Sequence, residues 1–243
     1  MQFLIFAISY PIIWILSLLP MRVLYILSDF LYILFFYLIG YRKKVVLENL
    51  QLAFPTKDLS ELKTIQKDFF KHFTDIFVES IKAFSITKKT LLKRYKFTNP
   101  ELINELYDKG RSIAFMGAHQ ANWEWSISIP LYVKIKCFGA YTRIGNTYFD
   151  KTVKKSRTKF GFIGYKTSET IKSITRNFDE GIQGLYLLLS DQSPQIHKTY
   201  YWREFMGIKV PIHTGAEMIA KKFDMAVVNY SVKKLKRGYF EVT

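Results

Sequence analysis

The chain has 243 residues, with 36 Lys and Arg against 20 Asp and Glu, so its formal net charge is +16. This length suits one domain with an appendage, and the charge suits an anionic partner such as nucleic acid, an acidic membrane surface, or an acidic protein or phosphorylated substrate. The hydrophobic fraction of 49% argues against a simple nucleic-acid binder, and the single cysteine, Cys137, excludes an intramolecular disulfide and a cysteine-rich zinc site.

The first part of the chain carries almost no charge. Residues 2–21 have no charged side chain, and residues 23–41 have only Asp29. A run of about 20 apolar residues is what the hydrocarbon core of a bilayer requires. Two arrangements are open: a transmembrane helix over about 3–19 followed by an interfacial segment, or a helical hairpin that turns at Leu19-Pro20-Met21-Arg22.

The position of Asp29 favours an interfacial or protein-facing place for the second segment, because an acid at the centre of a lone lipid-facing helix costs about 2.5–3.5 kcal/mol. Arg42, Lys43 and Lys44 follow as the basic flank expected at a cytoplasmic membrane face. The sequence therefore predicts a membrane-anchoring helical segment over 1–44 and a second domain over 45–243. A buried hairpin of a soluble domain is the alternative.

Downstream, the spacing of apolar residues predicts helices that alternate with strands. Apolar residues three and four apart indicate an amphipathic helix over 59–84, and Asn99-Pro100-Glu101 starts another that stops at Gly110. We expect strands at 112–116, 136–141, 161–165, 182–190, 225–232 and from 239, and helices from about 123 and at 146–160, 168–179 and 214–223. This alternation predicts an α/β fold with a mixed, largely parallel sheet flanked by helices. Because the chain ends inside an expected strand, we expect its natural C-terminus to be missing or unusually short.

The segment 117–124 carries the clearest sign of chemistry. An apolar strand delivers His119 to a turn, and Glu124 follows five residues later. Glu124 can serve His119 if it folds back, fixes the imidazole tautomer and stabilises the imidazolium. The sequence offers no serine in an elbow motif and no reactive cysteine, so we expect His119 to deprotonate a hydroxyl of the substrate. Gly117 is expected to let the substrate approach closely, and Asp191 also lies where an apolar strand ends.

His119-x4-Glu124 after an apolar strand resembles the signature of the lysophospholipid acyltransferase superfamily. The fuller form Gly-x-His-x-x-Asn-Trp-Glu is similar to that of the bacterial lipid A late acyltransferases, the lauroyl and myristoyl transferases, and of related mannoside acyltransferases. The resemblance extends over nearly the whole chain, through Arg42-Lys43-Lys44, Asn49-Leu50, Phe54-Pro55, Tyr141-x-Arg143, Phe160-Gly161, Ser190-Asp191-Gln192, Phe205-x-Gly207 and Thr214-Gly215.

This resemblance implies a glycerol-3-phosphate acyltransferase-like fold and a membrane-associated O-acyltransferase. Such an enzyme moves a fatty acyl chain from acyl carrier protein or coenzyme A to a hydroxyl of a glycolipid, with a lipid A precursor as the leading acceptor. The acyl donor is a co-substrate, and no metal or other cofactor is expected. The implied location is the bacterial inner membrane with the catalytic domain facing the cytoplasm, and no nucleic acid is expected as a partner.

The resemblance also implies roles for single residues. His119 is the general base and Glu124 its partner. Arg143 holds a phosphate of donor or acceptor, or stabilises the charge of the tetrahedral intermediate, with an ordinary surface cation as the alternative.

Four further residues are expected at the substrate site with competing structural roles. Asp191 and Gln192 contact the acceptor headgroup or orient the base, and a turn-forming role is also open. Asn122 is expected to bind substrate or to shape the loop and core. Arg157 is expected to line a basic entrance or to lie on a solvated face.

Two other functions stay open at this point: acylation of a different lipid, such as a lysophospholipid or an aminolipid, and lipid binding by a membrane protein without catalysis. The acyl-chain length, the choice between the two donors and the oligomeric state are not readable from the sequence.

Overall fold

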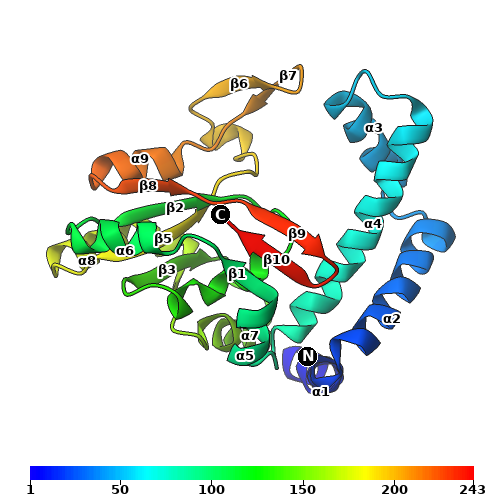
Figure 1. Ribbon diagram of the computed structural model, residues 1–243, viewed down its shortest axis with the longest axis horizontal. Helices are drawn as coiled ribbons and strands as arrows, with labels where there is room; N and C mark the ends of the chain where they lie inside the picture. The colour runs from blue at the N-terminus through cyan, green and yellow to red at the C-terminus, as the bar shows by residue number, and fades with distance from the viewer.

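The central feature of the protein is a β-sheet that helices cover on both faces (Figure 1). The computed structural model describes residues 1–243, except for the side chain of Lys198. The strand order is β4-β3-β5-β2-β8, and the pairings between these neighbours are parallel. The strands are β2 (Ile113–Gly117), β3 (Lys136–Tyr141), β4 (Ile163–Lys166), β5 (Gly184–Leu189) and β8 (Ala226–Asn229). The predicted α/β class with a largely parallel sheet flanked by helices is confirmed.

Alternate side chains of β2 enter hydrophobic cores on opposite faces of the sheet, as the two-residue period of a strand requires. Ile113 and Phe115 pack into the core that contains Trp125, whereas Ala114 enters the other core. Helices α8 (Thr170–Asp179) and α9 (Gly215–Lys222) supply that second core. The other helical segments around the sheet are α5 (Lys88–Arg94), α6 (Glu101–Asp108), η2 (Trp123–Leu131), α7 (Thr147–Thr158) and η3 (Thr167–Glu169).

The chain begins with two apolar helices that meet at a corner. Helix α1 (Gln2–Leu18) is followed by the extended residues Leu19 and Pro20, and α2 (Met21–Ile33) continues as the π-helix η1 (Leu34–Ile39). The chain therefore turns where the hairpin arrangement predicts, but it forms a corner and not a hairpin. Figure 1 shows α1 nearly end-on at the foot of α2, so the two helices do not run antiparallel.

By length and composition, Met21–Ile39 is the one helix among the described residues that could cross a membrane, and α1 is shorter. Of the two arrangements left open, the one with a transmembrane helix over about 3–19 is not favoured, because the helix that is long enough to span lies over 21–39. Much of the apolar surface of both helices is exposed, for example Ile8 at 68% and Ile26 at 69%.

Helix α4 (Leu59–Lys82) is the long helix predicted over 59–84, and it joins the N-terminal helices to the sheet. It begins where it does because the Asp58 side chain accepts hydrogen bonds from the backbone N–H groups of Ser60 at 2.8 Å and Glu61 at 2.9 Å. It follows the short helix α3 (Lys43–Ala53) and packs along α2. The division of the chain near residue 44 stays a prediction.

A cluster of charged side chains ties α2 to α4 and to the C-terminal strands. Arg237 lies 2.6 Å from Asp29 of α2 and 2.7 Å from Asp75 of α4. Lys234 is a second cation, 3.4 Å from Asp75, and Ser28 donates a hydrogen bond to the same carboxylate at 2.8 Å. Asp29 is thus paired with protein, in agreement with the expectation that its segment does not sit alone in lipid.

The C-terminal strands form a smaller sheet in the order β1-β10-β9, with β1 (Tyr95–Phe97), β9 (Val232–Lys236) and β10 (Tyr239–Val242). The strand predicted over 225–232 is borne out by β8, but its predicted C-terminal end is wrong. Strand β8 ends at Asn229 and β9 begins at Val232 in the other sheet. Between them, the ring of Tyr230 stacks on Phe115 with centroids 4.4 Å apart, so the chain leaves the central sheet with an aromatic side chain still in the core.

A two-stranded hairpin, β6 (Trp202–Phe205) and β7 (Ile208–Pro211), stands beside the rest of the fold (Figure 1). It turns at Met206 and Gly207, which have φ angles of 51° and 73°, as in the type I′ turns that suit two-residue hairpins. The short segment η4 (Ile196–Lys198) precedes it. The sequence pattern predicts no strand here, because most of its side chains are exposed and form no buried face.

Candidate active site

Two neighbouring strands of the central sheet bring His119 and Asp191 together. Strands β2 and β5 pair in parallel with Gly117 opposite Leu189, so both chains leave the sheet at the same edge. His119 and Asp191 each lie two residues beyond this pair. The carboxyl ends of parallel strands are where open α/β sheets bind their ligands. The two strand ends expected to carry chemistry are therefore adjacent.

Asp191 holds His119 by two hydrogen bonds. Its Oδ1 lies 2.8 Å from His119 Nδ1, and the backbone N–H of His119 donates to Oδ2 at 3.0 Å. Burial opposes ionisation of Asp191, but the hydrogen bonds from the His119 ring and backbone outweigh it and hold the pKa of the carboxyl below its usual value. A carboxylate at Nδ1 assigns the proton to that nitrogen and leaves the lone pair on Nε2.

The structure corrects the partner expected for His119. Glu124 accepts hydrogen bonds from Arg157, from Nε to Oε2 at 3.1 Å and from Nη2 to Oε1. Because η2 begins at Trp123, it turns Glu124 toward α7, which carries Arg157, and away from the His119 ring. The carboxylate at Nδ1 is that of Asp191, one of the roles left open for this residue. Glu124 holds Arg157 in a bidentate ion pair instead.

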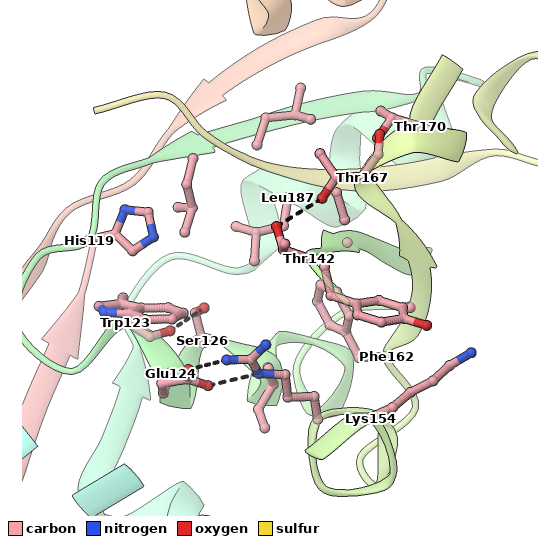
Figure 2. A pocket seen from close by; sticks show the side chains of 18 of the residues that line it. His119, Trp123, Glu124, Ser126, Thr142, Lys154, Phe162, Thr167, Thr170 and Leu187 are labelled. Atoms are coloured by element: carbon pink, nitrogen blue, oxygen red, sulfur yellow. Dashed lines mark hydrogen bonds and ion pairs between the residues drawn. The ribbon is translucent and has the colours of Figure 1, made fainter. Parts of the chain in front are cut away.

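A cavity of about 580 Å³ opens beside His119. Figure 2 shows His119 and Trp123 on one side of it and Thr142 and Thr167 across from them. The Trp123 ring meets the imidazole edge-on, with centroids 4.7 Å apart. The volume is within the range of about 300–1,000 Å³ that is usual for small-molecule sites.

The lining of this cavity combines apolar walls with positive charge. Lys154 and Arg157 of α7 supply the charge, and Glu124 neutralises part of it. Such a wall suits a substrate with an apolar chain and an anionic group. Among the apolar lining residues are Ile127, Val153, Phe162, Leu187, Leu188 and Leu189.

Gly117 has a different role from the one expected. A Cβ atom built on this residue would lie 2.2 Å from the nearest ring carbon of Tyr230. The absence of a side chain therefore makes room for a buried tyrosine of this chain, and the expectation that it admits substrate is wrong for this face of the backbone. Burial raises the pKa of Tyr230 to about 12, so its hydroxyl stays protonated at neutral pH.

Asn122 lies in the core. It is fully buried, and its Nδ2 donates a hydrogen bond to Glu79 Oε2 at 2.7 Å. The assignment of Asn122 as a substrate-binding residue is therefore corrected to the loop-shaping role, because no substrate reaches a side chain in this position.

The other expected site residues lie at the cavity or its rim. Gln192 lines the cavity, and so does His213, which the sequence does not single out as a site residue. Arg143 is exposed between the lining residues Thr142 and Ile144, and it forms no hydrogen bond or ion pair with any side chain that the structure describes. It is placed at the rim and is open to a ligand from solvent.

Sequence reasoning missed two residues that shape this site. Tyr230 lies more than 100 residues after His119, inside an expected strand. No local sequence pattern distinguishes it from an ordinary buried core residue. Glu79 lies in the last turn of α4, on a buried face that also carries the polar residues Gln66, Thr74 and Asp75, so the sequence does not single it out. Trp123, which contacts the His119 ring, is by contrast part of the Gly-x-His-x-x-Asn-Trp-Glu motif and is visible in the sequence.

The match to known proteins extends well beyond the site. A family model described as bacterial lipid A biosynthesis acyltransferase matches residues 2–243. A search of curated proteins finds none that matches this chain. The matched span includes His119, Asp191, the cavity and the apolar N-terminal helices. The chain therefore belongs to the bacterial lipid A biosynthesis acyltransferases, the family that its motifs resemble, and is an acyltransferase.

Proposed function

We propose that this acyltransferase transfers a fatty acyl chain from a thioester, either acyl carrier protein or coenzyme A, to a hydroxyl of a lipid A precursor, with His119 as the general base. The observation that carries the proposal is the His119–Asp191 pair at the edge of a largely apolar cavity of about 580 Å³. The family supplies the class of reaction, and the pair supplies a base for it.

In the proposed reaction the lipid hydroxyl gives its proton to Nε2 of His119 as its oxygen attacks the thioester carbonyl. An ester C–O bond forms and the C–S bond breaks. The leaving sulfur then takes the proton from His119 and departs as a free thiol. Asp191 keeps Nδ1 protonated and stabilises the imidazolium that forms between the two proton transfers.

The cations around the cavity fit the charges of both substrates. Arg157, fixed by Glu124, and Lys154 stand on the cavity wall, where they can stabilise negative charge that develops on the carbonyl oxygen. Arg143 at the rim is assigned to a phosphate of the donor or the acceptor. The net charge of +16 steers acidic donors and anionic lipid toward the protein.

The position of α1 supports access from a membrane. Gln2 donates a hydrogen bond to the carbonyl of Gly145 at 3.2 Å, and its own carbonyl accepts one from Asn146 at 2.8 Å. This contact places the exposed apolar helix beside Ile144 of the cavity lining. We assign the protein to the inner membrane with its cavity on the cytoplasmic side, so that a lipid acceptor reaches His119 along the bilayer surface.

The test is acyl transfer by purified protein with a lipid A precursor that bears a free hydroxyl, supplied separately with acyl carrier protein and with coenzyme A thioesters. Mass spectrometry should show a product heavier by one acyl group. His119→Ala and Asp191→Asn should each lower kcat by about 10²–10⁴-fold, because the first removes the base and the second removes the carboxylate that keeps Nδ1 protonated.

The matched control is His197→Ala, since His197 is an exposed histidine outside the cavity lining and should keep full turnover. Product formation by His119→Ala at the wild-type rate would overturn the role of the base. If neither donor yields product with the wild-type protein, the proposed reaction itself is wrong.

A further inference from the structure

A buried carboxylate on α4 is held by the N-terminal helices on one side and by the catalytic loop on the other. Glu79 is fully buried. Its Oε1 accepts a hydrogen bond from the hydroxyl of Tyr25 at 2.7 Å, and its Oε2 accepts one from Nδ2 of Asn122 at 2.7 Å. Its backbone carbonyl also accepts a bond from the indole N–H of Trp125 at 3.3 Å.

The Asn122 end of this link belongs to loop 118–122, which carries His119. The loop is fastened to three different parts of the fold, and these contacts are His119 to Asp191, Gln120 to the N–H of Val232, and Asn122 to Glu79. It leaves β2 and enters η2 within a few residues. The orientation of the imidazole therefore depends on side-chain anchors rather than on regular secondary structure.

Ala121 shows that these anchors hold the loop against a local preference. Its φ is 48°, a left-handed conformation that costs a non-glycine residue roughly 1–2 kcal/mol. Such a conformation persists only where the surroundings over-determine it. Ala121 lies between Gln120 and Asn122, whose side chains bond Val232 at 3.3 Å and Glu79 at 2.7 Å, and the bond to Glu79 is the shorter of these two adjacent anchors.

An alternative explanation is that Glu79 only joins helices α2 and α4. The α2–α4 interface has a second polar contact of that kind, from Ser28 to Thr74 at 3.1 Å and to Asp75 at 2.8 Å. Glu79 differs from this contact because its second oxygen leaves the interface and bonds the catalytic loop.

We propose that Glu79 is a positioning residue for acyl transfer, which acts through Asn122 to hold loop 118–122 with Nε2 of His119 toward the cavity. Through Tyr25, the same carboxylate fastens this loop to α2, the candidate membrane helix. The inference rests on the proposed role of His119 as the base. In this role Glu79 does not contact the substrate.

The first test compares Glu79→Leu and Asn122→Ala with the wild-type protein. Each should lower kcat by about 10- to 100-fold, because a shift of about 1 Å in a reacting group can cost 10²-fold. KM for the acyl donor should stay within twofold, since the cavity walls are untouched. The double variant should lose little more than either single variant, because both substitutions break the same link.

Glu79→Gln is the conservative variant. Its amide oxygen can accept from Asn122 and its NH₂ group can donate to the Tyr25 hydroxyl, so it should recover most of the wild-type kcat. Ser28→Ala is the matched control, because it removes a polar contact from the same α2–α4 interface without touching loop 118–122. It should keep the wild-type kcat.

Hydrogen exchange of the amides of residues 118–122 supplies a readout that needs no turnover. Exchange should rise in Glu79→Leu and Asn122→Ala but not in Ser28→Ala. Wild-type exchange in Glu79→Leu, or an equal loss of kcat in Ser28→Ala, would overturn the positioning role. A wild-type protein that transfers no acyl group would instead overturn the proposed function, and the exchange data would still decide the role of Glu79.

Discussion

At the scale of single residues, the backbone next to the catalytic histidine depends on a contact between Gly117 and Tyr230. The tyrosine ring covers the position that a Cβ atom on residue 117 would occupy, and it stacks on Phe115 of the same strand. A close approach of this kind leaves no free volume, because protein interiors are packed as densely as organic crystals. The end of β2 is thus fixed two residues before His119.

Gly117→Ala should therefore destabilise the protein by about 1–3 kcal/mol, the usual cost of overpacking a dense core. The clash distance is 2.2 Å to a ring carbon that is buried, so the ring has to move. Chemical denaturation of the two proteins measures the difference in the free energy of unfolding.

Gly215→Ala is the control for this substitution, because a Cβ atom there meets nothing within 4 Å. It should be neutral or slightly stabilising, since alanine favours the helix that begins at this position. Equal stability of Gly117→Ala and wild-type protein would show that the Tyr230 ring is free to shift.

The sequence identifies His119 and the strand that carries it, but not the partner of its imidazole. Glu124 is the acid nearest in the motif, whereas Asp191 lies 72 residues further along the chain. The packing of the whole sheet decides which strand pairs with β2. The apolar pattern of a buried parallel strand does not indicate which other strands it pairs with. The contact of Gly117 with Tyr230 depends in the same way on which strand pairs with β2, because Tyr230 follows its neighbour β8.

At the scale of elements, the ionic cluster around Arg237 holds three segments that are remote in the chain. The turn between β9 and β10 reaches α2 through Asp29 and α4 through Asp75. The Asp75 side chain is 4% exposed, so these partners take the place of water around its carboxylate. A buried carboxylate that loses its cation is costly, because the remaining charge cannot recover its hydration.

Arg237→Ala should lower the free energy of unfolding by about 2–4 kcal/mol, somewhat less than the 3–5 kcal/mol typical for breaking a buried pair, because Lys234 remains near Asp75. Thermal or denaturant unfolding in detergent measures the change. Lys233→Ala removes an exposed lysine from the same strand β9 and should have little effect. A loss of similar size in both variants would mean that net charge, and not the cluster, is responsible.

The helices and strands from 59 to 84 and from 101 to 190 are predicted to within a few residues, whereas α3, α5 and β1 are not predicted from the sequence. The exceptions have physical reasons. The segment 225–232 is mostly apolar, and its polar residues Asn229 and Ser231 do not by themselves show that β8 and β9 belong to different sheets. The β6–β7 hairpin has exposed faces, and without a buried face there is no alternation to read.

At the scale of the whole molecule, the buried Glu79 couples folding to pH. Burial raises its pKa from 4.5 to about 7, although hydrogen bonds from Tyr25 and Asn122 oppose the rise. Below pH 4.5 both folded and unfolded chains hold the proton, and between 4.5 and about 7 only the folded chain holds it. Unfolding then releases a proton, so the contribution to stability is lost as the pH rises through this window.

The free energy of unfolding of wild-type protein relative to Glu79→Gln should therefore fall between pH 5 and pH 8, by at most about 3 kcal/mol. The glutamine does not titrate, and the charged neighbours Asp75, Lys234 and Arg237 are present in both proteins, so the difference isolates the change at residue 79. Denaturation at several pH values measures the effect. Parallel stability curves for the two proteins would contradict it.

The register of β2 against β5 has a consequence for how the sequence can vary. The meeting of His119 with Asp191 is fixed by counting residues from one ladder pair, Gly117 and Leu189. One residue inserted in either strand would move a side chain by about 3.3 Å and turn it to the opposite face. Length changes can therefore accumulate in the segment that follows Asp191, where the hairpin lies, but not in the strands that precede the two residues.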